Sequence, residues 1–472
     1  MYIIMSEGPL TELVALGVQN DDLVSKDPNH SIFQDPIKKI TNFSKSSFIN
    51  HHKGQFNWGS TIKFEIERKG DLLSTCYLVL ELPTLSVENL DTPQFADPND
   101  TNEVLSPYYV TWSHVLGYAL IEKASIKIGG QLIDEQSGEY MQLVTDMRDD
   151  WNRFYMLGHD GVHNRPARRI EGQKIYIPLK FWFTQNINKA LPLVALQYHK
   201  VEIEIKIRDF DQITNVLKLV PDENGTRTLV HTDIKLKKSP LKSSNLDCTY
   251  IFLSPEERKK IAESEHKFLI TQTQERKFNL NSNIFELDFN HTVKEIFFFI
   301  QSRNNLDEGE IFNFSGKLGY PSKKFLKTVQ YNGDLIHPFS KNIWDEIPKT
   351  HHIEQARILL NGHERVQWKD YKYFYYVQPY ENFKNPNEHH YYIYSFSANS
   401  RSLGNYGGCN FSRIDNAQLQ LKLNKTTQRR VSAKTNTTLE MNKRGDDVLS
   451  IYAQNYNFLI IKGGMAGLQF NN

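Results

Sequence analysis

Alternating apolar and polar residues recur along most of the chain and predict many short strands. Residues 61–67 alternate strictly, and residues 78–82 form a second such run, which Pro83 ends. Alternation of this kind buries one face of a strand and leaves the other face in water. Further strands are predicted at residues 174–183, 194–207, 268–290, 294–301, 448–453 and 458–461. Because no regular series of helices separates the strands, the pattern predicts an all-β fold of antiparallel sandwiches.

Two short turns predict β-hairpins within this pattern. Gly129-Gly130 lies inside residues 122–133, and Asn361-Gly362 separates residues 355–360 from residues 365–368. Glycine and asparagine tolerate the positive φ angles that tight hairpin turns require. Each turn is therefore expected to join two neighbouring antiparallel strands.

Helical spacing of apolar residues is less common. It predicts a short helix at residues 140–150, and Ser254 followed by Pro255 is typical of a helix start. Apolar residues at i, i+3, i+4, i+7 and i+8 predict a third helix at residues 10–18. A helix this short is marginal alone. We expect it to pack on its own core or to dock on a neighbouring subunit or a membrane-side partner.

Three segments of the first half recur in the same order in the second half. The matched pairs are residues 124–131 with 356–363, 176–179 with 393–396, and 201–207 with 417–423. An internal repeat predicts one β-rich unit used twice. The chain has 472 residues, enough for two domains of roughly 200 residues each. We place an N-terminal arm at residues 1–26, the first unit at 27–245 and the second at 246–472.

Three polar segments interrupt the strands and are predicted to be surface loops. Residues 87–104 contain five acidic residues and no Lys or Arg. Residues 146–169 are rich in Gly, His and Arg, and residues 302–350 contain repeated turn-forming pairs. Long loops inside compact domains are usually functional or mobile. For the acidic loop, contact with a partner and a plain solvated insertion both stay open.

Overall charge and hydropathy exclude several classes of protein. The 56 Lys and Arg residues against 55 Asp and Glu residues leave a net charge of +1. Such a balance gives no general attraction to nucleic acid, and we expect no direct nucleic-acid binding. The longest apolar run, residues 296–300, is too short to span a membrane. The first ten residues lack the features of a secretion signal, so we expect a soluble intracellular protein.

The cysteines and aromatic residues fit this interpretation. Cys76, Cys248 and Cys409 are odd in number and far apart in the chain. They indicate a reducing compartment or small buried side chains, not a disulfide framework. Aromatic residues make up 12% of the chain, which suits half-buried, pleated surfaces.

Residues with the chemistry of an active site do not form a recognisable motif. The sequence contains no phosphate-binding glycine loop, no nucleophile elbow and no zinc-protease motif. His159 and His163 have a spacing that can chelate a metal on a helix, but Asp160-Gly161 between them disfavours a helix. Basic clusters at 165–169 and 429–430 lack interleaved aromatic residues and indicate solvated faces or subunit contacts. We therefore expect no catalytic residues, no metal site and no cofactor.

Residues 407–419 resemble the signature of the major capsid proteins of nucleocytoplasmic large DNA viruses. The signature residues are Asn410, Phe411, Ser412, Arg413, Ile414, Asp415 and Asn416. Similar motifs occur at residues 8–19, 41–43, 128–134, 138–139, 377–380, 392–396, 452–456 and 463–467. The resemblance covers most of the chain.

The resemblance implies two consecutive eight-stranded jelly-roll β-sandwiches with long loop insertions and a few short helices. In that family, three chains form a pseudo-hexameric capsomer, and capsomers tile an icosahedral shell, usually over an internal membrane. The implied partners are two further copies of the chain, neighbouring capsomers, penton and minor capsid proteins, and the viral membrane through the N-terminal arm. The implied location is the virion capsid, assembled in the host cytoplasm, with the three polar loops on the outer tower of the capsomer.

The signature also has a direct physical interpretation. It lies immediately before residues 417–423, which alternate strictly, and Arg413 and Asp415 share one face if the segment is extended. The two side chains could form a structural pair within the fold or join neighbouring chains.

Two other function classes stay open on the residues. A carbohydrate-binding sandwich could use residues 371–380, which contain six Tyr or Phe residues, as a stacking surface. Otherwise this run is expected to pack in the core or in a subunit interface. A double-sandwich glycoside hydrolase needs two converging carboxylates. Glu139 and Asp415 are available, although nothing in the sequence pairs them.

Overall fold

The computed structural model describes residues 40–54, 56–91, 108–113, 115–148, 166–221, 227–307, 309–315, 351–383, 385, 390–402, 404–424 and 447–470. Residues 43–472 form one compact unit, to which the following description refers. Several expectations fall outside the described residues: the helix at 10–18, the arm at 1–26, His159, His163, the cluster at 429–430 and most of the three polar loops.

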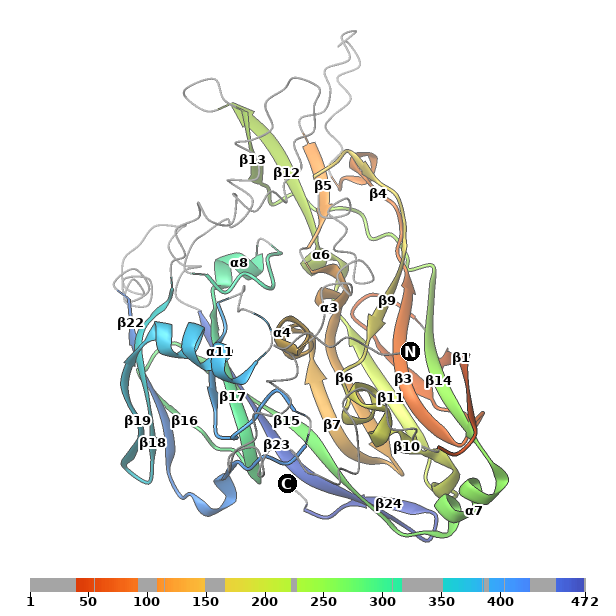
Figure 1. Cartoon of the computed structure of the whole chain (residues 1–472). Helices are drawn as coiled ribbons and strands as arrows, with labels where there is room; N and C mark the ends of the chain where they lie inside the picture. The colour runs from red at the N-terminus through yellow and green to blue at the C-terminus, as the bar shows by residue number, and fades with distance from the viewer. Residues whose placement is uncertain are drawn as a thin grey trace, which may run out of the picture. The chain divides into compact units, whose positions relative to one another are not determined.

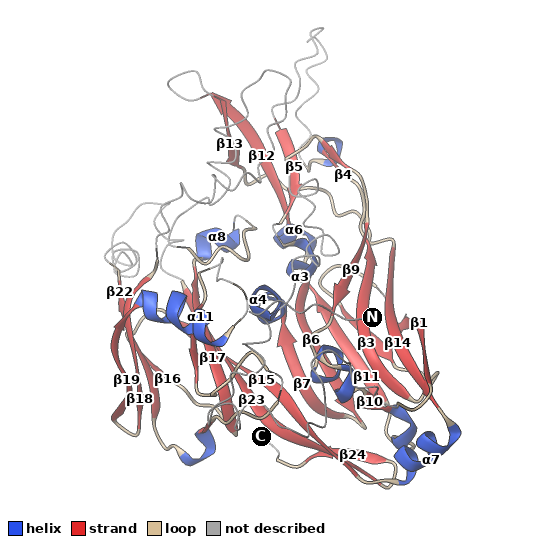
Figure 2. Ribbon diagram, viewed as in Figure 1, coloured by secondary structure: helices blue, strands red, loops and turns tan. Residues whose placement is uncertain are grey.

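The first half of the unit is a sandwich of two antiparallel sheets, which join into one nine-stranded sheet where residues 52–53 pair with residues 63–64 (Figures 1 and 2). One sheet contains β9 (Lys174–Pro178), β3 (Leu72–Glu81), β14 (Ser243–Leu253) and β1 (Phe43–Lys53). The other contains β2 (Thr61–Glu65), β11 (Val201–Ile207), β6 (Ile121–Ile128) and β7 (Gln131–Ser137). Inward side chains of both sheets, such as Leu78 and Ile203, are fully buried in one core.

The second half repeats this arrangement. One sheet contains β15 (His266–Asn279), β23 (Val448–Lys462), β17 (Thr292–Gln301) and β20 (Tyr392–Ser395). The other contains β16 (Ile284–Glu286), β22 (Ala417–Leu423), β18 (Ile353–Leu360) and β19 (His363–Asp370). Phe298 from the first of these sheets and Leu419 from the second lie in a common core.

Strand pairing shows that the repeat in the sequence is a repeat of structure. In the first sandwich Ala124 of β6 lies opposite Ile205 of β11. The matching residues of the second sandwich, Ala356 and Leu421, are also directly opposite each other. The order of neighbouring strands is therefore the same in both halves, and the β6–β11 and β18–β22 pairs share one register. The fold is two consecutive jelly rolls, as the family resemblance implied.

The two predicted hairpin turns are confirmed. Gly129 and Gly130 join β6 to β7 with φ angles of 58° and 83°. Asn361 and Gly362 join β18 to β19 with φ angles of 50° and 81°. Positive φ at both central residues is the geometry that matches the right-handed twist of the flanking strands.

The predicted boundary between residues 245 and 246 falls inside β14. This strand pairs along its length with β3 and β1, so residues 246–253 belong to the first jelly roll. The predicted helix start at Ser254 is confirmed: α7 (Pro255–Glu263) follows β14 directly and leads to β15. The chain thus passes from one sandwich to the other at α7.

Other element boundaries also differ from the prediction. The strands predicted at 448–453 and 458–461 are one continuous strand, β23. The glycines after it turn the chain back into β24 (Met465–Leu468). The strand predicted at 174–183 ends at Pro178 and continues into the helix α5 (Trp182–Gln185).

A helix follows the hairpin in each jelly roll. The first is α4 (Gly138–Arg148), close to the helix predicted at 140–150. The second is the aromatic run, where a π-helical turn (Tyr373–Val377) leads into α11 (Gln378–Asn382). Within the described part of the chain, no helix is long and apolar enough to cross a membrane.

Candidate functional site

The two jelly rolls meet at a buried junction built around α4, which lies between them in Figure 1. The Tyr140 ring of α4 lies 6.3 Å from the Phe297 ring of β17 and 5.7 Å from the Tyr452 ring of β23. Phe297 and Tyr452 point away from the core of their own sandwich and join the core of the first. We call this outward face of the second roll, formed by Glu295, Phe297, Phe299, Tyr452 and Gln454, the junction face.

A buried ion pair crosses the junction. Arg148, the last residue of α4, pairs with Glu295 of β17, and their side chains are 10% and 0% exposed. Arg148 also donates a 3.1 Å hydrogen bond to Gln454, whose amide donates to the Tyr140 hydroxyl at 2.8 Å. Loss of either charge would leave the other buried and unpaired, which typically costs about 3–5 kcal/mol. This network therefore fixes how the two rolls are oriented.

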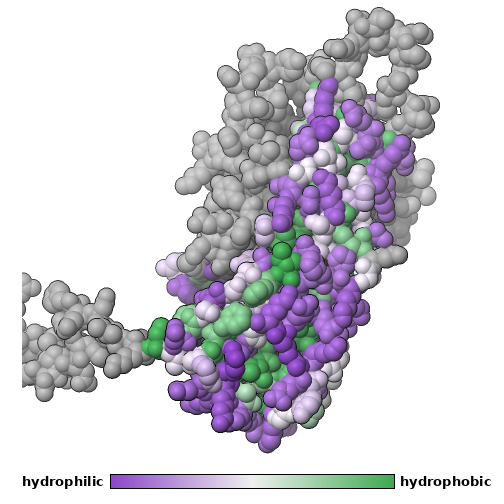
Figure 3. Space-filling view, turned by 90° about the vertical axis from the view of Figure 1, so that its right-hand side faces the viewer, coloured by the Kyte–Doolittle hydropathy of each residue, from purple (hydrophilic) through white to green (hydrophobic). Residues whose placement is uncertain are grey.

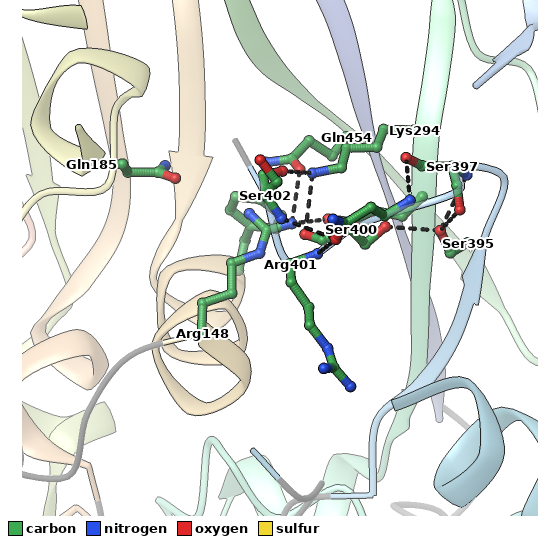
Figure 4. Close-up of polar contacts among 12 residues, drawn as sticks. Arg148, Gln185, Lys294, Ser395, Ser397, Ser400, Arg401, Ser402 and Gln454 are labelled. Carbon is green, nitrogen blue, oxygen red and sulfur yellow. Dashed lines mark hydrogen bonds and ion pairs between the residues drawn. The ribbon is translucent and has the colours of Figure 1, made fainter. Parts of the chain in front are cut away.

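A second polar cluster surrounds Lys294, the residue before Glu295 in the chain (Figure 4). Lys294 donates hydrogen bonds to the backbone oxygens of Ser400 and Ser402 at 3.2 and 3.0 Å. The Ser395 and Ser400 hydroxyls are 2.8 Å apart. Burial lowers the pKa of Lys294 to about 8. These donors bind backbone oxygens of the connection after β20, so the cluster holds that connection against β17.

The two carboxylates considered for a hydrolase do not form a pair. Glu139 is buried in the first roll, and its Oε1 accepts a 2.6 Å hydrogen bond from Arg208. Burial raises the pKa of Glu139, but the charges of Arg208 and Lys277, together with hydrogen bonds to the carboxylate, outweigh burial and leave that pKa below its ordinary value. Asp415 is an exposed residue that precedes β22 of the second roll. The structure provides no carboxylate pair from Glu139 and Asp415.

Histidines of the second roll take part in aromatic packing. The His351 ring stacks on Tyr371 at 4.0 Å and lies 4.7 Å from the His390 ring. Among the described residues, no group of three or more His, Cys, Asp or Glu side chains is placed to hold a metal ion.

The aromatic run at residues 371–382 is divided between core and surface. Phe374 and Tyr375 are buried in the core of the second roll. Tyr376, Val377 and Tyr380 are 48%, 40% and 82% exposed. The expected core packing therefore holds for one side of the helix only, and the other side presents three apolar or aromatic side chains to solvent.

The signature residues form a tight connection between β21 (Cys409–Asn410) and β22. Phe411 is buried, with its ring 6.1 Å from Phe289 and 5.6 Å from Phe396. The side chain of Asn410 accepts a 3.2 Å hydrogen bond from the Ser412 amide. Ser412 in turn accepts one from the His291 amide at 2.7 Å.

The end of the signature is tied to the second hairpin. The Asn416 amide donates to the Asn361 side chain at 2.9 Å, and the Asn361 amide donates to the Asn416 oxygen at 2.6 Å. Arg413 and Asp415 are exposed, and no ion pair joins them within the described chain. The signature thus contains a buried residue, Phe411, that holds it on the core, and two charged residues, Arg413 and Asp415, that are exposed to solvent.

The junction itself was not predicted from the sequence. One signal was present: Glu295 interrupts the apolar strand 293–300, and an acid in a strand buried on both faces requires a basic partner. Cys76 and Cys248 are 172 residues apart in the chain, yet they lie directly opposite each other in β3 and β14, with their sulfurs 3.4 Å apart. Spacing in the sequence gives no information about such cross-strand neighbours.

Two protein-family models match the chain in succession. The model for the N-terminus of the major capsid protein matches residues 31–254, and that for large eukaryotic DNA virus major capsid proteins matches residues 257–467. The major capsid protein of Phaeocystis pouchetii virus is 28% identical, with 98% of this chain and 100% of that protein covered. The major capsid protein of Paramecium bursaria Chlorella virus 1 is also 28% identical, with the same coverage.

Solved structures show the same fold. The PBCV-1 virus capsid chain matches with a TM-score of 0.67 at 23% identity, covering 94% of this chain and all of that chain. The Faustovirus major capsid protein matches with a TM-score of 0.63 at 13% identity, covering 97% and 99%. The family consists of structural capsid proteins, not enzymes. The chain belongs to the family of major capsid proteins of large eukaryotic DNA viruses.

Proposed function

We propose that three copies of this chain form a capsomer of pseudo-hexagonal outline, and that such capsomers tile the icosahedral shell of a virion. The observation that carries the proposal is the shared strand register of the two jelly rolls. Two similar units in each chain let a three-fold ring present six similar edges, and hexagonal tiling needs six. The family membership supports the same role.

The capsomer's further partners are also part of the proposal. Neighbouring capsomers, penton proteins and minor capsid proteins would contact its edges, and the arm at 1–26 would face an internal membrane. The amphipathic spacing of residues 10–18 supports the arm's role. Cys76, Cys248 and Cys409 are free thiols, which supports assembly in a reducing compartment such as the host cytoplasm.

Measurement of the mass in solution tests the trimer. Light scattering on the purified chain should give a stable species of three times 55.0 kDa. Electron micrographs of the same fraction should show particles of hexagonal outline. A strict monomer at every concentration, or a monomer that binds glycans through its exposed tyrosines, would contradict the proposal and favour a carbohydrate-binding sandwich.

A further inference from the structure

Each jelly roll has two parts of the kind that form the junction. One is the helix after its hairpin. The other is the outward face of one sheet, β15-β23-β17-β20 in the second roll and β9-β3-β14-β1 in the first. Within the chain, the helix of the first roll, α4, packs on the outward face of the second roll. Two equivalent parts are left over: the helix of the second roll and the outward face of the first roll. Both present exposed apolar side chains in the described structure.

We propose that residues 371–382 of one copy dock on the outward face of the β9-β3-β14-β1 sheet of a second copy. This contact would repeat between chains the contact that α4 makes within a chain. The inference rests on the proposed trimer and names the surfaces that form it. It is a head-to-tail contact, and three such contacts close a ring.

Strand register shows that the two helices are equivalent. Gln136 of β7 lies opposite Ala124, and Lys369 of β19 lies opposite the matching residue Ala356. Helical structure begins two residues later in each case, so Gly138 corresponds to Tyr371. The exposed Tyr376, Val377 and Tyr380 therefore lie on the helix that corresponds to the buried α4.

The end of this helix is fixed in place, although its side chains are exposed. Arg401 donates a 2.7 Å hydrogen bond to the backbone oxygen of Tyr380. Gln378 accepts a 3.0 Å hydrogen bond from the Ser395 amide, which ties the helix to β20. A preorganised aromatic surface loses little conformational entropy on binding. Exposed aromatic clusters of this kind are typical of protein interfaces.

Register also identifies the receiving face. In the second roll Glu295 lies opposite Gln454, and in the first roll the equivalent residues Tyr77 and Asp247 lie opposite each other. By the same correspondence, Tyr77, Val79 and Glu81 of β3 and Asn245 and Asp247 of β14 match the five residues of the junction face. Together with their outward neighbours Ile49 and Tyr176, they form the receiving face, which is the outward face of the β9-β3-β14-β1 sheet.

The receiving face is partly apolar and partly polar. Ile49 is 50% exposed and Tyr176 is 37% exposed. Figure 3 views the side of the molecule that carries β1 and β14, where green apolar residues gather between purple hydrophilic ones. The residue equivalent to Glu295 is Tyr77, which carries no charge. The contact between copies would therefore have no buried ion pair equivalent to Arg148–Glu295. A more polar contact without that ion pair suits chains that must stay soluble before assembly.

The signature residues next to β22 predict a second contact between the same two copies. Within the chain, Tyr198, three residues before β11, donates a 3.0 Å backbone hydrogen bond to Gly464, in the turn between β23 and β24. The equivalent residue before β22 is Ile414, between Arg413 and Asp415. The equivalent of Gly464 lies just beyond β14, at the start of α7, where Glu256 is exposed. Arg413 of one copy would therefore face the acidic first turn of α7 in the next.

The docking surface is tested with charge placed on its exposed side chains. The double variant Val377→Glu, Tyr380→Glu should fold as the unmodified chain does, because both side chains are largely exposed. It should raise the dissociation constant of the trimer at least tenfold, measured by light scattering across a dilution series. Ile284→Glu is the matched control: Ile284 is 50% exposed, and its counterpart Lys63 is also exposed in the first roll. The control should remain a trimer.

A charge exchange tests the second position independently of the helix. Arg413→Glu and Glu256→Arg should each weaken the trimer, and the two together should restore it. If the unmodified chain is a trimer and the helix variant dissociates no more readily than Ile284→Glu, the inference is wrong while the proposed function stands. If the unmodified chain is a monomer, both fail.

Discussion

At the scale of single residues, the junction between the two rolls contains a titratable group in an unusual setting. Asp134 of β7 is 3% exposed. Its carboxyl accepts hydrogen bonds from the Thr273 amide at 2.9 Å and from Gln136 at 2.8 Å. Thr273 belongs to β15 of the second roll, so Asp134 links the two sandwiches. Burial outweighs these hydrogen bonds and raises the pKa of Asp134 to about 7.

This raised pKa predicts that the junction weakens as pH rises. Between about pH 4 and pH 7 the folded chain holds a proton that the unfolded chain has released, so the free energy of unfolding falls across this range. The shift from 3.8 to about 7 corresponds to a loss on the order of 4 kcal/mol. Asp134→Asn should flatten this part of the profile, as measured by urea unfolding at pH 5 and pH 8.

The control for this measurement is Asp288→Asn, because the Asp288 side chain is 84% exposed. That variant should keep the pH dependence of the unmodified chain. An Asp134→Asn profile that runs parallel to the unmodified one would show that Asp134 does not carry the effect.

At the scale of elements, the position of α4 depends on its first residue. A Cβ atom at Gly138 would lie 2.3 Å from the backbone oxygens of Ile121 and Tyr118. Since backbone atoms cannot move aside as a flexible side chain can, only glycine lets α4 begin this close to β6. The helix then carries Tyr140 and Arg148 into the junction.

Gly138→Ala should therefore displace α4 and destabilise the chain on the order of 2–3 kcal/mol. Thermal unfolding followed by circular dichroism measures this change. Gly467→Ala is the matched control, since a Cβ there would meet only the Gln131 side chain at an ordinary 3.7 Å. Equal melting temperatures for the two variants would contradict the packing argument.

The helices also show where prediction from the sequence was incomplete. The helix near residues 140–150 was predicted from its spacing, but the helical form of residues 371–382 was not. Six aromatic residues in ten favour a strand by propensity. The structure places Phe374 and Tyr375 in the core through a π-helical turn, a rare local geometry without a sequence pattern of its own.

At the scale of the whole molecule, the second roll depends on the first. Phe297, Phe299 and Tyr452 of the second roll are at most 1% exposed, and they belong to the core of the first roll. Without the first roll, the junction face would be a large apolar surface in water. The two jelly rolls therefore share buried surface and are not independent domains.

Residues 255–472 produced alone should consequently aggregate and bind a hydrophobic dye, as measured by sedimentation and dye fluorescence. Replacement of Phe297, Phe299 and Tyr452 by Ser in this fragment should reduce both effects, because it removes the exposed apolar side chains. A monodisperse unmodified fragment that unfolds cooperatively would show that the second roll is stable by itself.

The local features of this protein were determined by the sequence. Side-chain alternation with a period of two specified the strands, and the φ tolerance of Gly129-Gly130 and Asn361-Gly362 specified the two hairpins. The internal repeat predicted two matching units, and strand pairing confirmed it in register. Such properties depend on residues close together in the chain, so they can be derived from the sequence.

The contacts between distant segments were decided by the tertiary structure alone. β14 completes the first roll by pairing with β1, which precedes it by 200 residues at Ser47 and Asp247, and this pairing moves the boundary to α7. The pairing of Arg148 with Glu295 likewise joins segments 147 residues apart. Nothing in the local pattern selects such partners, because many strands and charged residues could pair. The packing of one jelly roll against the other buries a large surface, and this burial selects which strands and charged residues pair.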